Sequence, residues 1–270
     1  MGLTPRRTGF LYGYGVLRPE YEFATENVAA LHYYQTVHCR AIMCGRFTLG
    51  TSRQTICDHF GIGNQPFQAV LKPRYNIAPS QNIAVVSKLP DNPAPQLSLM
   101  HWGLIPHWAK DKKMSYKMIN AKAETLSGKP AYRQAYKKRR CLIPADGFYE
   151  WEVLKEKKQP YYIHYHHNDV FAFAGLWEQW GELESEDLVY SCTIITTEAD
   201  KKISAIHNRM PVIMSPEYYE RWLDPANQDT GSLQGLLVTD TSDLEMYPVS
   251  TVVNSPKNDG RDLVERMAID

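Results

Sequence analysis

Cys44 has the most reactive setting in the sequence. It follows a second methionine in Met43-Cys44-Gly45-Arg46-Phe47, well inside a chain of 270 residues. If the working chain begins at Cys44, this residue carries a free α-amine and a thiol on adjacent carbons, with ordinary pKa values of about 7.7–8.0 and about 8.5. Such an aminothiol condenses with an aldehyde to a Schiff base, which the thiol closes to a thiazolidine. The alternative is an internal, buried thiol, the common state of a free cysteine.

The segment before Cys44 decides between these alternatives. Residues 1–42 contain no lysine and no apolar run long enough for a signal-peptide core or a membrane span. The arginine-rich start resembles a transit peptide only faintly, because three glutamates follow. We expect residues 1–42 to be an extension, either a mis-assigned start or a removable pro-segment, and residues 43–265 to form the functional domain.

Three other side chains are suited to chemistry. Asn120, in Ile-Asn-Ala-Lys, could hydrogen-bond a substrate hydroxyl or carbonyl, or could simply fix a loop. Glu150 lies between Tyr149 and Trp151, where desolvation would raise its pKa and suit a proton shuttle; the alternative is an exposed glutamate on a strand. His207 occupies a polar turn, and an imidazole can donate or accept a proton near neutral pH.

Positive charge is concentrated in one window, although the net charge of the chain is zero. Residues 107–140 hold eleven lysines and arginines against Asp111 and Glu124, and aromatic residues including Trp108 are interleaved with them. Cations along a phosphate backbone and flat faces for bases are what single-stranded nucleic acid requires. The alternative is a solvated helix face, since residues 130–140 are typical of a short helix.

Short strands dominate the rest of the predicted domain. We expect strands at 45–49, 82–88, 97–102, 141–143, 148–154, 160–166, 170–177 and 188–196, and helices near 51–60, 130–140, 198–204 and 216–223. Turn chemistry is expected at 74–79, and a surface loop with two prolines at 91–95. This pattern predicts a single α+β domain on a curved, barrel-like, mostly antiparallel sheet with a few short helices.

The sequence calls for no metal and no organic cofactor. The five cysteines are odd in number and form no CxxC pair, and no P-loop or dinucleotide motif is present. His164, His166 and His167 lack acidic or thiol partners at zinc-binding spacing and are expected on a strand surface.

Ordered motifs give the sequence a family resemblance. The chain resembles the SOS-response-associated peptidase (SRAP) family over about residues 43–260. The motifs are Met-Cys-Gly-Arg-Phe (43–47), Arg-Tyr-Asn-Ile-Ala-Pro (74–79), Trp-Gly-Leu-Ile-Pro (102–106), Ile-Asn-Ala-Lys-Ala-Glu-Thr (119–125), Pro-Ala-Asp-Gly-Phe-Tyr-Glu-Trp (144–151), Phe-Ala-Gly-Leu-Trp (173–177), Thr-Ile-Ile-Thr-Thr-Glu-Ala (193–199) and Ile-His-Asn-Arg-Met-Pro (206–211).

The resemblance implies the SRAP fold and covalent shielding of abasic sites in single-stranded DNA. It implies that Cys44 crosslinks to the ring-opened sugar, that Asn120 holds the sugar, that Glu150 shuttles protons and that His207 acts as acid or base. It further implies self-processing of the N-terminus, a peptidase activity, and lyase-like chemistry. The DNA-binding residues that it implies are Arg46, Arg74, Asn76, Pro79, Trp108, Lys122 and Arg209.

Two departures from the family pattern are visible. Lys122 stands where arginine is common, which weakens the case for a bidentate phosphate contact there. His107 stands where some relatives have a second aromatic residue beside Trp108.

The sequence leaves two other functions open. One is a peptidase or amidohydrolase with a cysteine nucleophile, which would turn over amide substrates. The other is a non-covalent single-stranded DNA-binding module, whose binding would be sensitive to salt and indifferent to Cys44. The expected setting is a monomer in the cytoplasm, associated with DNA and possible replication-fork partners rather than with a membrane.

Overall fold

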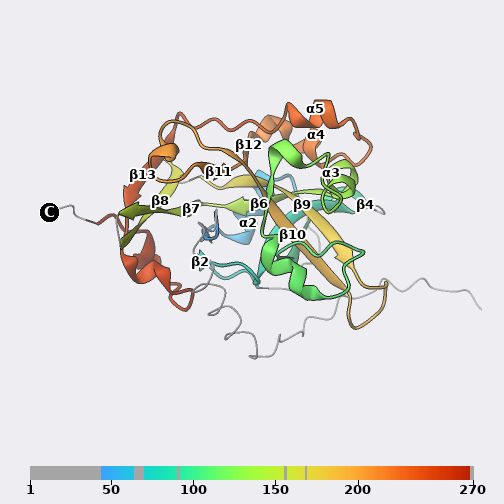
Figure 1. Cartoon of the computed structure of the whole chain (residues 1–270), viewed down its shortest axis with the longest axis horizontal. Coiled ribbons are helices and arrows are strands. Elements are labelled where there is room, and N and C mark those ends of the chain that lie inside the picture. The colour runs from blue at the N-terminus through green and yellow to red at the C-terminus, as the bar shows by residue number, and fades with distance from the viewer. Residues whose placement is uncertain (1–43, 64–69, 90–91, 155–156, 168, 268–270) are drawn as a thin grey trace, which may run out of the picture. The chain divides into compact units, whose positions relative to one another are not determined.

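The structure is a computed structural model that describes residues 44–63, 70–89, 92–154, 157–167 and 169–267 (Figure 1). The expected extension at residues 1–42 lies outside the described residues. None of the helices in the described part of the chain is long and apolar enough to cross a membrane.

The smaller of two sheets contains the strand that follows Cys44. Its order is β13-β8-β7-β1-β2 and its pairings are antiparallel. Phe47 of β1 pairs with Phe148 of β7 and with Ile77 of β2, so β1 is central. Continuing the β1–β7 register toward the N-terminus brings the residues next to Cys44 opposite Glu150. The strands are β1 (Phe47–Leu49), β2 (Arg74–Ile77), β7 (Gly147–Leu154), β8 (Lys157–Tyr165) and β13 (Leu244–Pro248).

The larger sheet closes on itself. Strands β10, β4, β3, β6 and β9 pair in that order, and β9 pairs again with β10, so these strands form a ring. Most pairings are antiparallel, while β4 and β5 run parallel to β10. The strands are β3 (Asn82–Leu89), β4 (Asn92–Trp102), β5 (Asn120–Lys122), β6 (Arg140–Ala145), β9 (Phe171–Trp180), β10 (Val189–Glu198), β11 (Arg209–Pro211) and β12 (Ile213–Met214). The predicted curved α+β architecture is confirmed.

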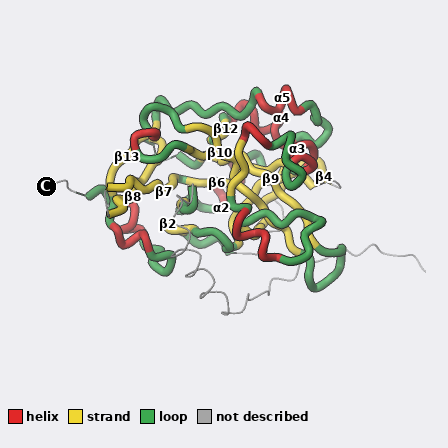
Figure 2. The backbone as a smooth tube through the Cα atoms, viewed as in Figure 1, coloured by secondary structure: helices red, strands yellow, loops and turns green. Residues whose placement is uncertain are grey.

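The helices of the described residues are short, and α3, α4 and α5 lie together at the upper right of the view (Figure 2). Ser52 begins the first described helix by accepting a hydrogen bond from the Thr55 N–H at 3.2 Å. The α-helices are α2 (Arg53–His59), α3 (Arg133–Lys138), α4 (Tyr219–Leu223) and α5 (Thr230–Gln234). Single 3₁₀ turns occupy Lys112–Lys117, Ala123–Thr125, Ile203–Ala205, Pro216–Tyr218, Thr251–Asn254 and Arg261–Val264.

An aromatic cluster packs the two sheets together. Phe47 and Phe148 of the smaller sheet both make edge contacts with Phe173 of β9, with ring centroids 5.8 and 5.9 Å apart. The Phe47 ring also meets the Trp102 ring edge-on at 5.2 Å. These four side chains are completely or almost completely buried, so the strand that carries Cys44 is fixed against the ring of strands.

Three expectations about the elements were wrong. The turn expected at 74–79 is largely β2, because residues 74–77 pair with the edge of β1. Of the loop expected at 91–95, residues 92–95 belong to β4, whose prolines fall beside a register shift between Ser87 and Leu89, where a missing N–H is tolerated. The helix expected at 198–204 is only the turn Ile203–Ala205, because Glu198 still pairs with Arg209.

Candidate active site

Cys44 and Glu150 are in direct contact. The Cys44 backbone N–H donates a 2.8 Å hydrogen bond to Oε1 of Glu150. Both residues are buried, with 2% and 1% of their surface exposed. The contact joins two of the four predicted catalytic residues, which are more than one hundred positions apart in the sequence. The antiparallel β1–β7 register produces it.

Burial makes Glu150 a weak acid. Desolvation raises the pKa of its carboxyl from 4.5 to about 8, against the opposing effect of hydrogen bonds from Cys44 and from the Trp151 N–H. Most of the carboxyl is therefore protonated at pH 7 in the full-length chain, where the Cys44 nitrogen is an uncharged amide. The predicted desolvation of Glu150 is confirmed, and the alternative of an exposed glutamate on a strand is wrong.

The Cys44 thiol is kept protonated. Burial raises its pKa well above the ordinary value, and the neighbouring Glu150 carboxyl raises it further. The backbone φ of Cys44 is +42°, in the left-handed region that residues other than glycine rarely adopt. Such a conformation persists only where the surroundings enforce it, and it often marks a functional position. Because the thiolate is the nucleophilic form of cysteine, the raised pKa means that the thiol must lose its proton as its sulfur bonds to an activated carbon.

Asn120 and His207 approach from either side of β10. Asn120 begins β5 and pairs with Ile194, while β11 pairs with the end of β10 through Arg209 and Glu198. Asn120 is half-buried, and its backbone carbonyl accepts a hydrogen bond from the Tyr132 hydroxyl at 3.2 Å. The strands next to these two residues thus both pair with the C-terminal half of β10.

His207 is held by one neighbouring backbone unit. Its Nδ1 lies 3.1 Å from the Arg209 nitrogen and 3.0 Å from the Arg209 carbonyl oxygen. A neutral ring accepts from the N–H, and a protonated ring donates to the carbonyl, so Nδ1 has a partner in either state. The imidazole is 9% exposed and its orientation is fixed by these contacts.

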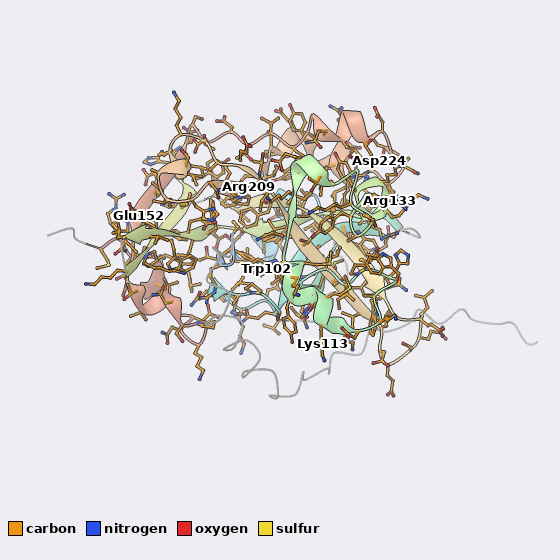
Figure 3. The ribbon with its side chains drawn as sticks, viewed as in Figure 1. Trp102, Lys113, Arg133, Glu152, Arg209 and Asp224 are labelled. Atoms are coloured by element: carbon orange, nitrogen blue, oxygen red, sulfur yellow. The ribbon has the colours of Figure 1, made fainter. Side chains whose placement is uncertain are left out.

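Trp102 connects the two halves of the site. Its ring packs on Phe47, and its Nε1–H donates a 3.0 Å hydrogen bond to the carbonyl of Ile119, the neighbour of Asn120. Figure 3 places Trp102 and Arg209 near the middle of the view, with Glu152 and Arg133 toward opposite ends. Cys44 and Glu150 contact each other directly, whereas Trp102 links Phe47, three residues after Cys44, to the segment that carries Asn120.

Arg46 and Arg209, predicted DNA contacts, have extensive partners within the protein. Arg209 forms a two-pronged ion pair with Glu124 at 2.8 and 2.9 Å and donates to the Thr196 carbonyl at 2.6 Å. This pairing lowers the pKa of Glu124. Burial lowers the pKa of Arg46 to about 10, so its guanidinium remains charged at pH 7. Both arginines are 8% exposed, so each offers a ligand little more than an edge.

The second group of predicted DNA contacts lies on and after β2. Arg74 keeps 34% of its side chain exposed and pairs with Asp259. Pro79 is half-buried. Asn76 is completely buried, and its side chain bonds to Arg46 and to backbone carbonyls of the C-terminal segment. A direct contact of Asn76 with DNA does not fit this burial; its amide instead holds the fold.

Trp108 and Lys122 lie at the surface. Trp108 is 50% exposed and borders an open hollow of about 720 Å³. Arg133, Lys138 and Arg139 line this hollow together with His107, Pro130, Gln134 and Glu178. Part of the basic window therefore surrounds an exposed aromatic ring, as the nucleic-acid interpretation predicts. Arg140 does not contribute, because it is buried and its guanidinium binds five backbone carbonyls.

Sequence reasoning missed the acidic partners of these arginines. Glu124 lies in the motif at residues 119–125, and nothing in its local sequence indicates that it pairs with Arg209. Glu178 accepts a 2.7 Å hydrogen bond from Arg139, and Asp259 binds Arg74. His164 and His166 also face a carboxylate, Glu245. In the described ranges, no group of three or more His, Cys, Asp or Glu side chains is placed to hold a metal ion.

Comparison with known proteins identifies the family of the chain. The model of the SOS response associated peptidase (SRAP) family matches residues 43–256. The chain belongs to the SRAP family. An SRAP relative from Bacillus subtilis strain 168, named abasic site processing protein YoqW, is 48% identical over 225 residues, covering 83% of this chain and 99% of the relative. Abasic site processing protein HMCES of Xenopus tropicalis is 33% identical, covering 69% of this chain and 64% of the relative.

Solved structures support the same fold. A phage-related protein from Bordetella bronchiseptica is 31% identical, with a TM-score of 0.63 over 76% of this chain and 94% of that one. A protein from Bacteroides thetaiotaomicron has a TM-score of 0.72 over 83% of this chain and all of its own, at 24% identity, a likeness of fold alone. The SRAP architecture of the described domain is therefore shown by both sequence and structure.

Proposed function

We propose that this SRAP protein captures abasic sites in single-stranded DNA through a thiazolidine formed by Cys44. The observation that carries the proposal is the 2.8 Å contact between the Cys44 nitrogen and the buried Glu150 carboxyl. A carboxyl at this nitrogen can take the proton that keeps an α-amine unreactive. The names of the relatives supply the substrate class, since an abasic site exposes a sugar aldehyde when its ring opens.

The reaction balances with the loss of one water. Glu150 accepts a proton from the Cys44 α-ammonium, and the free amine attacks the aldehyde carbon. The same carboxyl returns a proton to the departing hydroxyl, which leaves as water and gives the Schiff base. The Cys44 sulfur then adds to the imine carbon, while the thiol proton passes to the nitrogen. A carboxylate that already contacts this nitrogen can take up the proton and return it within one site.

His207 and Asn120 have supporting roles in the proposal. His207 opens the sugar to its aldehyde form by donating a proton to the ring oxygen as its bond to the anomeric carbon breaks, while the anomeric hydroxyl gives up its proton to water. The contacts of its Nδ1 with the Arg209 backbone fix the imidazole and favour this role. Asn120 holds a sugar hydroxyl by its amide, without titrating.

DNA would follow the basic side of the site. Arg74 and the edges of Arg46 and Arg209 face phosphates, Lys122 adds a point charge, and Pro79 lines the path. Trp108 stacks on a base beside the hollow that Arg133 and Lys138 line. Asn76 contributes by holding Arg46, with its Oδ1 2.9 Å from the Arg46 Nη1.

The proposal requires a free amine at Cys44. In the full-length chain this nitrogen is part of a peptide bond, so residues 1–43 must be absent or removed. Self-processing by the same site is the peptidase activity in the proposal. A general cysteine hydrolase is less well supported, because the thiol has a raised pKa and Nδ1 of His207 is bound to Arg209.

Intact mass spectrometry with abasic single-stranded DNA tests the proposal. A chain that starts at Cys44 should gain the mass of one oligonucleotide less one water. Cys44→Ser is the matched control, because an amino alcohol still forms a Schiff base but gives no stable thiazolidine. Its adduct should appear only after borohydride reduction. A stable adduct on Cys44→Ala without reduction would refute the proposal.

A further inference from the structure

The C-terminal segment 250–264 is hydrogen-bonded to Arg46 and to β2, where proposed phosphate contacts lie. Arg46 donates to the Val253 carbonyl at 2.9 Å and to the Asn254 carbonyl at 3.2 Å. The buried Asn76 amide donates to three carbonyls of the same segment, those of Val253, Ser255 and Asn258, at 3.1, 3.0 and 2.7 Å. Val253 and Leu263 anchor the segment in a small apolar cluster with Tyr149. The segment therefore forms one wall of the site.

Asp259 is the charged member of this segment. Its Oδ1 accepts hydrogen bonds from the Tyr75 N–H at 2.5 Å and the Asn76 N–H at 2.7 Å. Its Oδ2 accepts from Nε of Arg74. Nη2 of the Arg74 guanidinium donates to Oε1 of Gln81 at 2.9 Å. One carboxylate thus fixes both the β2 backbone and the orientation of Arg74.

We infer that Asp259 is a positioning residue that presents the Arg74 guanidinium to a DNA phosphate. The contacts with Asp259 and Gln81 use two of the five N–H donors of an arginine, and Arg74 stays 34% exposed. An arginine already held in place loses less side-chain freedom when it binds an anion. The inference rests on the proposed function, because it takes DNA as the ligand.

Asp259 could also oppose binding, because its negative charge repels a DNA phosphate. Its negative charge is opposed by the Arg74 cation and by two backbone N–H donors, and its side chain is only 27% exposed. Because these groups oppose its charge, the carboxylate adds little net negative charge at the surface. Preorganisation of Arg74 therefore outweighs the repulsion.

Asp259→Asn separates positioning from folding. The asparagine keeps an oxygen for the two β2 N–H groups, and its NH₂ then faces the Nε–H of Arg74, donor against donor. Only the contact with Arg74 is lost. Asp259→Ala removes all three bonds and serves as the comparison for general loss of structure, read from the melting temperature. Arg74→Ala supplies the second side of a double-mutant cycle.

The measurement is the Kd for intact single-stranded DNA by fluorescence anisotropy, with the crosslinking rate at saturating abasic DNA beside it. We expect Asp259→Asn to raise the Kd by about 3- to 10-fold. The saturating rate and the melting temperature should stay near those of the wild type. In the Arg74→Ala background, the same substitution should leave the Kd unchanged.

Two results would overturn the inference. One is Asp259→Asn binding DNA as tightly as the wild type, or more tightly, which would make the carboxylate neutral or repulsive. The other is a loss of equal size in the Arg74→Ala background, which would make its role structural. Wild-type protein that binds DNA without crosslinking would refute covalent capture alone, because the Kd comparison needs no covalent step.

Discussion

Glu150→Gln is the substitution that isolates the ionisation of the buried carboxyl. Glutamine is close to glutamate in shape, and its Oε1 can still accept the hydrogen bond from the Cys44 nitrogen. It cannot take up or return a proton. General acid–base catalysis by one group contributes about 10²- to 10⁴-fold. We expect the initial rate of crosslinking to fall within that range, while the Kd for intact single-stranded DNA stays unchanged.

The same substitution should change how stability depends on pH. In the full-length chain, the folded-state pKa of Glu150 is about 8, above its ordinary 4.5, so the folded state holds this proton more tightly than the unfolded state. The stability that it contributes is complete below pH 4.5 and decreases as the pH rises to about 8. Between pH 6 and pH 9, the wild type should lose about 2–3 kcal/mol relative to Glu150→Gln.

Urea denaturation at pH 6 and pH 9 of both proteins in the form that retains residues 1–43, verified by intact mass, measures this difference. Single-turnover crosslinking of abasic DNA by the forms that begin at Cys44 measures the rate. Cys44→Ser reports whether any remaining adduct depends on the thiol. Parallel pH profiles for wild type and Glu150→Gln would refute the raised pKa. A crosslinking rate reduced less than tenfold would refute the role of Glu150 as the proton shuttle.

The remaining predictions concern the hollow and the partly buried ion pair between Arg209 and Glu124. Trp108→Ala should weaken binding to single-stranded DNA by about 1–3 kcal/mol through a lost stacking face, measured by anisotropy; unchanged affinity would remove Trp108 from the DNA path. Lys138→Ala should lower the slope of log K against log salt by about 0.7, the share of one phosphate contact on a single strand, and an unchanged slope would assign the hollow another role. Arg209→Lys should lower the free energy of unfolding by about 1–3 kcal/mol, because lysine cannot form both bonds to Glu124; unchanged denaturation would contradict this.

The proximity of two candidate residues could be explained better than the contacts that support the site. Cys44 and Glu150 are candidates from reactivity, from an aromatic setting and from the family resemblance, and the structure brings them together. Asp259 could not be found in this way. It lies 184 residues from Tyr75, and a single aspartate before a glycine carries no local signal of its partner. Contacts across such separations depend on the closed topology rather than on neighbouring residues.

Charge was the least reliable guide at the level of single residues. The basic window correctly indicated a cationic surface beside Trp108. Within it, Arg139 pairs with Glu178, and Arg140 is buried against backbone carbonyls. Counting charges in the sequence cannot separate arginines that bind backbone carbonyls from arginines that face a ligand, because both kinds carry the same five N–H donors. Burial separates them.

The intact mass of the expressed full-length protein, before and after incubation with abasic single-stranded DNA, tests the central claim most directly. We expect a chain that begins at Cys44 and then gains the mass of one oligonucleotide less one water. A chain that retains residues 1–43 and still forms the same stable adduct would contradict it, because no aminothiol would be present. So would a chain that begins at Cys44 and never gains mass.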